Sequence, residues 1–560
     1  MVVYSGAHAL VEALKREKVE VIFGIPGGAI MPVYDVLKDS GIRHILARHE
    51  QSAAHMADGY ARASGKVGVA MATSGPGTTN LVTGIANAYM DSIPVVAITG
   101  QVPTHQLGTD AFQETDALGI FNPITKYVFQ PRRPTEIPYV VKAAFYLAST
   151  GRTGPVVIDV PKDVQVGEAD MVFPDKVEIR GYVPSHPPDP SAIERTAEIL
   201  LNAERPVILA GGGVIKSGSC DVMVALAEYL LIPVVTTLMG KGSIPENHPL
   251  AMGPIGMHGT YQANKLVMES DVILSLGVRF SDRSTMDVSE FTKERKIIHF
   301  DIDPTEIGKN VKPYHYVVGE LRTAITMLYE AVKRRVRSKK ESLWAKRAKQ
   351  LKEEYDGRVF GINKELCSPN IVKKIREILP VNGIVTTEVG QNQMWASLYF
   401  KVLKPRTFIT SGGLGTMGFG FPAAIGAKAA KPDVPVVDIA GDGSFLMTCN
   451  SLATSVTEGL PVVVCILNNS VLGMVAQWQR LFYQGRYSAV WLGPTPDFVQ
   501  LAKAFKAEGV RVHSLEEFEK AFKEAIKSEV TTVIDIPISP EENVFPFVPV
   551  GESLKNMMVG

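Results

Sequence analysis

The sequence is poor in cysteine and has no long apolar run, and these two absences narrow the class of protein. The 560 residues include four cysteines, Cys220, Cys367, Cys449 and Cys465, without the spacing of a disulfide framework or a zinc site. We therefore expect buried free thiols in a reducing compartment. No apolar stretch reaches the roughly 18 residues of a membrane span, and residues 5–15 have the pattern of an amphipathic helix and not that of a signal peptide. A cytoplasmic protein, or a mature form, is the expectation.

The chain also lacks an excess of either charge. Lys plus Arg and Asp plus Glu number 58 each, which gives no electrostatic case for a nucleic-acid or anionic-membrane partner. Hydrophobic residues make up 46% and charged residues 21%, as in ordinary globular proteins with ample core. The length predicts about three or four domains. Any ligand must therefore be recognised by local sites.

Strand patterns alternate with helical stretches in successive units along the chain. The first unit, 1–172, ends at a proline-rich connector (174–190); a second unit spans 190–330, a charged helical stretch 323–355, a third unit 365–540, and a C-terminal arm 541–560. Strands are expected at 19–25, 67–73, 94–100, 155–160, 206–210, 233–238, 272–276, 296–302, 383–388, 407–410, 434–440, 461–467 and 531–537. This alternation predicts an α/β protein with three doubly wound parallel-sheet domains. Glycine-rich elements at 73–80 and 410–420 suggest that the first and third units are distant duplicates.

In the third unit, two polar elements each follow a Val/Ile-rich strand pattern. Gly441, Asp442 and Gly443 follow 436–440, and Asn469 follows 462–467. Both side chains would emerge at the carboxyl edge of a parallel sheet, where ligands bind, and Mg²⁺ typically combines one or two protein oxygens with phosphate oxygens. Alone, each element is more often an ordinary turn or strand exit. Together they resemble the magnesium and diphosphate motif of thiamine diphosphate (ThDP) enzymes, with a helix expected to begin near Ser444 and direct its positive end at the anion.

Glu50 gives an independent indication of the same chemistry. It follows a short strand pattern at 44–47 and begins a helix of small residues, where a carboxylate could be mostly buried. ThDP chemistry needs a carboxylate hydrogen-bonded to N1′ of the aminopyrimidine, which favours the 4′-imino tautomer that removes the thiazolium C2 proton. A lone Glu at a helix start is usually only a favourable charge on the helix dipole. With the magnesium motif in the same chain, Glu50 is interpreted as catalytic.

On these motifs the chain, from about Gly6 to its last residues, resembles the ThDP-dependent carboligases and decarboxylases, and among them the acetohydroxyacid (acetolactate) synthase large subunits. Segments 24–30, 73–80, 108–114 and 151–164 carry the resemblance. It implies that Gln113 and Lys162 line the active site, that Phe112 touches the substrate pocket, and that the Gly28 region approaches the reacting carbon. By its pattern alone, Gln113 would be a loop residue.

In the third unit the resemblance implies a cofactor loop and a substrate pocket. Residues 412–417 resemble the loop whose bulky side chain, here Met417, bends ThDP, although Met417 is equally typical of core filling. Residues 473–478 resemble the stretch that distinguishes acetohydroxyacid synthases, with Met474 and Trp478 at the second-substrate pocket. Residues 470–472 depart from the acidic or polar residues of most relatives, so Val471 would bind Mg²⁺ only through its carbonyl. The ThDP residues implied are Pro26, Glu50, Gln391, Gly415, Met417, Gly441, Asp442, Gly443, Ser444, Asn469, Gly473 and Met474, with Asp442, Asn469 and Val471 as metal ligands.

The middle unit has glycines after a strand pattern, at 211–213, which alone are a weak indication of a nucleotide site. Segments 256–260, 277–283 and 301–303 resemble the FAD-binding segments of the family, although Ser281 replaces the more usual Asp. Arg283 is implied to bind the carboxylate of the second 2-ketoacid, which suits a bidentate guanidinium. The residues implied to bind FAD are Arg152, Gly211, Gly212, Gly213, Thr237, Leu238, Met257, His258, Gly277, Arg279, Arg283, Asp301 and Ile302.

The resemblance implies decarboxylation of pyruvate on ThDP and addition of the hydroxyethyl carbanion to pyruvate or 2-ketobutyrate, the first common step of valine, leucine and isoleucine synthesis. The products would be 2-acetolactate and 2-aceto-2-hydroxybutyrate. The cofactors implied are ThDP, Mg²⁺ and FAD, in a homodimer or homotetramer with a small regulatory subunit. Two alternatives stay open: a catabolic, flavin-independent acetolactate synthase or another ThDP-dependent 2-ketoacid decarboxylase, and a non-catalytic FAD-binding protein. The flavin segments argue against the first and Glu50 against the second.

Overall fold

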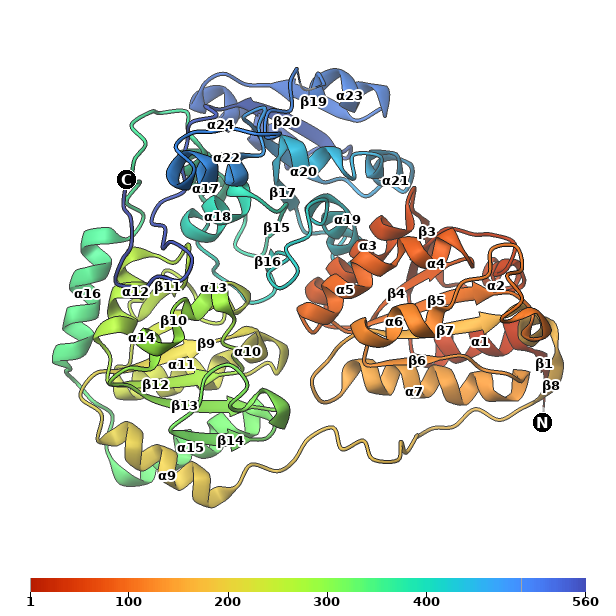
Figure 1. Cartoon of the computed structure of the whole chain (residues 1–560), viewed down its shortest axis with the longest axis horizontal. Coiled ribbons are helices and arrows are strands. Elements are labelled where there is room, and N and C mark those ends of the chain that lie inside the picture. The colour runs from red at the N-terminus through yellow and green to blue at the C-terminus, as the bar shows by residue number, and fades with distance from the viewer. Residues whose placement is uncertain (1, 495) are drawn as a thin grey trace.

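A computed structural model describes residues 2–494 and 496–560. Within these residues it contains three six-stranded parallel sheets flanked by helices, one in each third of the chain, and a small two-stranded sheet of β1 (Val2–Ser5) and β8 (Glu168–Met171) (Figure 1). The expected fold class, three doubly wound α/β domains, is confirmed. No helix in the described part of the chain is long and apolar enough to cross a membrane.

The first and third sheets have the same strand order. The first runs β3-β2-β4-β5-β7-β6 and the third β16-β15-β17-β18-β20-β19, so both read 2-1-3-4-6-5 when strands are numbered within the sheet. The bounds are β2 Val21–Gly24, β3 Arg43–Leu46, β4 Gly68–Ala72, β5 Val95–Gln101, β6 Tyr127–Phe129, β7 Val156–Pro161, β15 Ile384–Thr387, β16 Phe408–Ile409, β17 Val436–Gly441, β18 Val463–Asn468, β19 Glu508–Arg511 and β20 Thr532–Pro537. This common order supports the duplication. The glycine-rich elements that suggested it are not equivalent, because 73–80 follows the third strand of its sheet and 410–420 follows the second.

The middle sheet has a different order, β11-β10-β9-β12-β13-β14, which reads 3-2-1-4-5-6. Its strands are β9 Pro206–Ala210, β10 Val234–Thr236, β11 Ala251–Pro254, β12 Val272–Leu276, β13 Lys296–Asp301 and β14 His315–Val318. This is the order of dinucleotide-binding sheets, in which the ligand lies where the order reverses. That point lies between β9 and β12.

Every expected strand is present within two residues of its expected bounds. The charged stretch 323–355, expected as one helical segment, is instead two helices, α15 (Leu321–Arg335) and α16 (Leu343–Tyr355). Three basic residues, 333–335, lie in the last turn of α15, where positive side chains interact favourably with the helix dipole. Ser342 caps α16 by accepting from the Ala345 amide. The connector between β8 and α9 (Pro190–Leu201) contains no helix or strand in residues 172–189 and runs extended (Figure 1).

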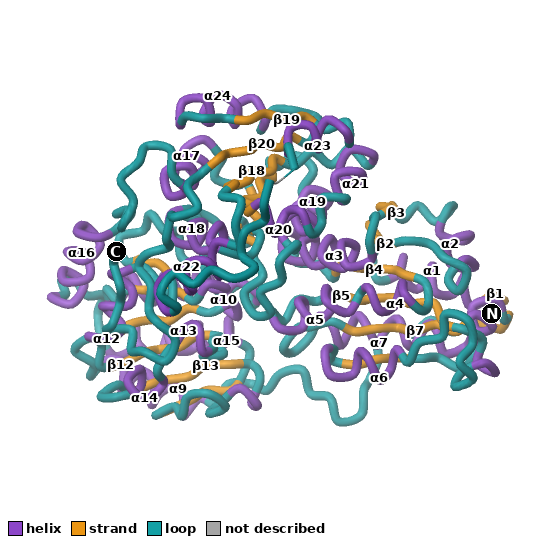
Figure 2. The backbone as a smooth tube through the Cα atoms, turned by 45° about the horizontal axis from the view of Figure 1, so that its top comes forward, coloured by secondary structure: helices purple, strands orange, loops and turns teal. Residues whose placement is uncertain are grey.

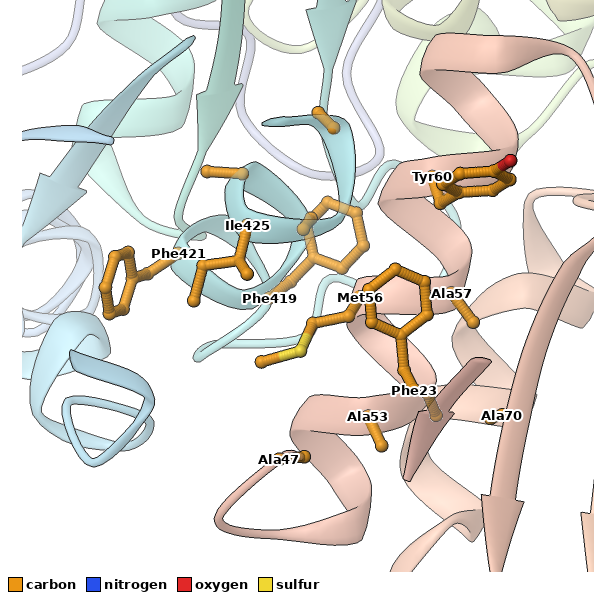
Figure 3. Packing of buried hydrophobic residues seen from close by; sticks show 14 of the residues in the cluster. Phe23, Ala47, Ala53, Met56, Ala57, Tyr60, Ala70, Phe419, Phe421 and Ile425 are labelled. Atoms are coloured by element: carbon orange, nitrogen blue, oxygen red, sulfur yellow. The ribbon is translucent and has the colours of Figure 1, made fainter. Parts of the chain in front are cut away.

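One helix of the first domain, α3 (Glu50–Ser64), packs against one helix of the third, α19 (Gly420–Ala430), and both views place them side by side (Figures 1 and 2). A Cβ at Gly59 would lie 2.1 Å from the carbonyl oxygen of Ala423, and one at Gly426 would lie 1.9 Å from that of Met56. Only glycine permits this backbone approach. Met56, Phe419 and Ile425 pack beside the contact (Figure 3).

The C-terminal residues cross from the third domain to the middle one. The Val548 amide donates to the Met257 carbonyl at 2.8 Å. Phe547 and Leu554 are buried in a hydrophobic cluster that they share with residues of the middle domain. Met557 Sδ accepts from Asn264 of α12 (Tyr261–Glu269) at 3.3 Å, and the last residue, Gly560, lies beside Gly361. The arm therefore links two domains.

Candidate functional site

Residues from all three domains line a central cavity of about 980 Å³. Twelve of the thirteen residues expected to contact FAD are on its wall, the exception being Gly211. Gly415, Met417, Met474 and Trp478 line it from the third domain, and Asp91 and Ser92 from the first. The cavity is large enough for a dinucleotide-sized ligand by the usual range of binding pockets.

The glycines of the middle domain lie at the reversal point of its sheet. Gly211 and Gly213 donate to the carbonyls of Leu276 and Gly277 at 2.9 and 3.3 Å. A Cβ at Gly211 would lie 2.0 Å from the Gly277 oxygen, and one at Gly213 would lie 2.8 Å from the Gly277 Cα. The two strand exits are therefore in backbone contact, and the cavity opens beside them.

Two further side chains expected at the flavin differ in how they are engaged. Arg152 forms ion pairs with Glu306 at 2.5 Å and Asp303 at 3.2 Å, which anchor the first domain to the middle one. Burial lowers the pKa of His258 to about 3, so its ring is neutral at physiological pH. Its buried Nδ1 has no hydrogen-bond partner among the described residues. A neutral ring with an unsatisfied nitrogen on the cavity wall fits a ligand that supplies a polar atom.

Asp442 lies at the carboxyl end of β17, as expected, and is buried. The helix expected near Ser444 begins two residues earlier, at Asp442, and ends at Leu446, because an acidic residue favours the first turn. Burial raises the pKa of Asp442 to about 6, and its Oδ2 has no partner among the described residues. A buried carboxylate with an unsatisfied oxygen needs a cation.

Asn469, at the end of the neighbouring strand β18, is also buried, and its Oδ1 accepts from the Val471 amide at 3.2 Å. Among the described residues, no three His, Cys, Asp or Glu side chains converge as in an all-protein metal site. One carboxylate and one amide oxygen match a hard cation that takes its remaining ligands from phosphate, water or a backbone carbonyl such as that of Val471.

Gln391, at the start of α18 (Gln391–Tyr399), connects this edge to α22 (Gly473–Phe482). Its Oε1 accepts from Asn469 Nδ2 at 3.4 Å and its Nε2 donates to Gln477 Oε1 at 2.9 Å. A Cβ at Gly473 would lie 2.1 Å from Gln391 Oε1, which explains the glycine. Gln477 was not predicted, although it lies inside the 473–478 stretch; its complete burial is visible only in the fold.

Met474 and Trp478 lie one turn apart on α22, and both line the cavity. Trp478 also packs against the core beneath the C-terminal arm, and its buried Nε1 has no partner in the described residues. Trp478 therefore lines the cavity and packs in the core, and its role at the acceptor pocket stays a prediction. Arg283 also lines the cavity, is half-exposed and pairs with Asp282 at 3.2 Å.

Glu50 begins α3 in the first domain. In a single chain its side chain is only partly buried, whereas the sequence led us to expect a mostly buried carboxylate. Its Oε2 accepts from Asn80 Nδ2 at 2.9 Å, and its Oε1 faces Gly77, whose Cβ position lies 3.6 Å away. Gln113 has a left-handed backbone, with φ of 61°, and packs against Gly75. These residues, with Pro26 and Gly28 after β2, lie on one edge of the first sheet.

One chain does not bring all the candidate residues together. Gly28, Lys162 and Phe112 are exposed, Phe112 to 88%. Neither these residues nor Glu50 and Gln113 are among those that line the central cavity. The candidate residues therefore fall into separate groups, one on the first domain and the others on the middle and third domains.

Comparisons with known proteins find matches to all three units of the chain. Three family models match: the thiamine pyrophosphate enzyme N-terminal TPP binding domain at residues 4–120, its central domain at 193–328, and its C-terminal TPP binding domain at 388–536. The probable acetolactate synthase large subunit of Methanocaldococcus jannaschii is 52% identical over 99% of this chain and 95% of its own length. The acetolactate synthase large subunits of Parasynechococcus marenigrum and Corynebacterium glutamicum are each 45% identical, over 99% and 98% of this chain and 91% and 89% of their own lengths.

Proposed function

Because the chain belongs to the acetolactate synthase large subunits, a family of ThDP enzymes, we propose that it joins two 2-ketoacids with loss of CO₂. Two pyruvates give 2-acetolactate, and pyruvate with 2-ketobutyrate gives 2-aceto-2-hydroxybutyrate. The observation that carries this proposal is the near-full-length similarity to enzymes of that name in a chain that also contains Glu50 and the Asp442/Asn469 pair. ThDP is assigned to domains 1–172 and 365–540, and FAD to 190–330.

Bound ThDP supplies a carbon nucleophile and an electron sink. In this chain Glu50 would hold a proton at its Oε1, the oxygen not engaged by Asn80, against the aminopyrimidine. Met417, with Gly415 on the cavity wall, would support the bent cofactor. Gln113 and Lys162 would orient the ketoacid, with Phe112 closing the pocket.

We assign Mg²⁺ to Asp442, Asn469 and the Val471 carbonyl, with the diphosphate completing the coordination. The unsatisfied Oδ2 of Asp442 supports this assignment. Gly441, Gly443 and Ser444 lie around Asp442 at the start of α20, where backbone amides are available to the diphosphate. Gln391 and Gly473 would fix the position of Asn469.

FAD is proposed to lie in the central cavity, with its dinucleotide at the β9/β12 reversal point and Arg283 left to bind the acceptor carboxylate. The purified protein should be yellow, and its flavin spectrum should be the same before and after turnover because the condensation is redox-neutral. Absorbance spectra and chromatography of the released cofactor test this. A colourless protein that stays fully active after flavin removal would favour the flavin-independent alternative.

We propose that two copies of the chain complete each active site. The separation of the Glu50 group from the cavity supports this proposal. The relatives named as large subunits favour a small regulatory partner as well. Sedimentation of the purified chain should show at least a dimer.

The decisive experiment is a colorimetric assay of acetolactate formed from pyruvate, with each of ThDP, Mg²⁺ and FAD present or withheld. Activity should require ThDP and Mg²⁺. No acetolactate from the fully reconstituted protein would overturn the proposal.

A further inference from the structure

We propose that Asp91 is a positioning residue that fixes the loop 412–417, and with it the side chain of Met417. The inference rests on the proposed function, because Met417 matters to catalysis only if its loop supports ThDP. Asp91 belongs to the first domain and follows α5 (Val82–Met90) directly. The loop belongs to the third domain.

The carboxylate of Asp91 is fully buried and accepts hydrogen bonds from two successive glycine amides. Gly413 N donates to Oδ1 at 2.8 Å and Gly412 N donates to Oδ2 at 3.1 Å. Arg62 Nη2 also donates to Oδ2, at 2.9 Å. A Cβ at Gly413 would lie 2.8 Å from Oδ1, so glycine is needed for this approach. Charge-assisted bonds of this kind in a buried site are strong and directional.

A second anchor holds the other end of the same loop. Asn87 Oδ1, from α5, accepts from the hydroxyls of Ser411 and Thr416, the latter at 3.2 Å. Ser411 Oγ in turn accepts from the Thr416 amide at 2.9 Å. Thr416 directly precedes Met417, so α5 determines the position of the loop on both sides of its glycines.

All three domains meet at Asp91. Its backbone carbonyl accepts from Lys216 Nζ of the middle domain, and the adjacent Ser92 Oγ accepts from Arg152 Nε at 2.9 Å. Lys216 and Asp91 both line the central cavity. The middle domain, to which FAD is assigned, therefore helps to hold Asp91 in place.

Asp58 offers a matched control. It is buried, pairs with Arg62 and accepts from Asn87 Nδ2 at 3.1 Å, but it does not bond the loop amides. Asp58→Asn and Asp91→Asn thus remove the same charge from the same arginine. Only Asp91→Asn replaces one of the two oxygens that accept from Gly412 and Gly413 by an NH₂ group, which cannot accept.

We expect Asp91→Asn to lower kcat by about 10- to 100-fold at saturating ThDP and pyruvate, with KM for pyruvate changed much less, since a misplacement of about 1 Å costs on this order. Hydrogen exchange of a peptide covering 411–418 should accelerate in Asp91→Asn. Asp58→Asn should lower thermal stability comparably, but it should lower kcat and accelerate the exchange much less than Asp91→Asn does, because Asp58 reaches the second anchor only through Asn87 Nδ2 and not through the oxygen that holds the loop.

Equal losses of kcat in the two variants, or wild-type kcat in Asp91→Asn, would overturn the inference. If Asp91→Asn does not fold, Ser411→Ala tests the second anchor and should lower kcat with faster exchange of 411–418; wild-type values of both would overturn it. Failure of the proposed function would show differently, as wild-type protein that makes no acetolactate.

Discussion

The first and third domains share one strand order but place their acidic groups differently. Each has a helix after the second strand of its sheet, α3 and α19, and each helix start is next to a glutamate. Glu50 stands on α3 itself and leaves one oxygen free, whereas Glu388 is fully buried and accepts from the amides of Gly418 and Phe421 at 2.7 and 3.0 Å. Burial raises the pKa of Glu388. The same residue type is thus a structural cap in one copy and a candidate acid–base group in the other.

The two domains also differ in the residues that follow the third strand of each sheet. After the third strand of its sheet, the third domain has the buried Asp442, and the first domain has Thr73, Ser74 and Gly75 without a carboxylate. In a doubly wound sheet both positions lie at the reversal point where ligands bind. The common strand order therefore provides two equivalent edges, to which we assign different parts of the proposed chemistry.

We expect the largest effect on kcat at Glu50, the glutamate that does not cap a helix. Glu50→Gln should leave the fold and ThDP binding largely intact and lower kcat by about 10²- to 10⁴-fold, because an amide cannot take up the proton that the carboxylate does. Glu388→Gln is the matched variant in the third domain. It should affect thermal unfolding more than kcat, as measured by calorimetry beside the acetolactate assay. Wild-type turnover of Glu50→Gln with saturating ThDP would refute the role of Glu50.

Asp442→Asn tests the other half of the comparison. It should weaken Mg²⁺-dependent ThDP retention by at least about 10-fold, the usual cost of a change at a metal site. Isothermal titration calorimetry with ThDP, with and without Mg²⁺, measures this. Unchanged affinity would place the cation elsewhere.

The pKa of Asp442 adds a pH dependence. Because it is raised from 3.8 to about 6, the native state binds more protons than the unfolded state between these values, and the apoprotein loses stability as pH rises through this interval. Above about pH 6 the penalty is fully present. Apo Asp442→Asn should therefore unfold at a higher temperature than the apo wild type at pH 7.5, and at a similar temperature at pH 4. Mg²⁺ affinity of the wild type should rise from pH 5 to 7, as the carboxylate loses its proton.

The contact between α3 and α19 should be about equally sensitive to a substitution on either helix. Gly59→Ala and Gly426→Ala each place a Cβ against a backbone carbonyl of the facing helix. We expect each to destabilise the protein by about 1–3 kcal/mol, the usual cost of overpacking. Thermal unfolding measures the two losses. A much smaller loss at one glycine would show that the interface is less symmetric than the strand order.

Central strands were predictable because they are continuous apolar runs, buried on both faces. Four short edge strands, β6, β11, β14 and β19, and the small sheet of β1 and β8 were missed, since short strands at an edge lack a long apolar run. At the site, Asp442 and the FAD glycines could be located because each directly follows such a strand. Asp91, Lys216 and Gln477 could not, because their contacts join segments that lie far apart in the sequence, such as Asp91 and Gly412.

The smallest expected effect concerns acceptor choice, at Trp478. The Trp478 ring lines the cavity and also packs on the core of the middle domain. It can influence the choice of acceptor only if the side that faces the cavity contacts the acceptor. One methylene in a hydrophobic pocket is worth about 1–3 kcal/mol. Trp478→Leu should therefore lower the preference for 2-ketobutyrate over pyruvate by roughly 10-fold, while 2-acetolactate still forms from pyruvate alone. A competition assay at fixed concentrations of both ketoacids measures the two products. An unchanged product ratio in a folded variant would leave Trp478 as a packing residue, and acceptor discrimination would have to come from other residues of the cavity wall, such as Arg283, or from the first domain of a second copy.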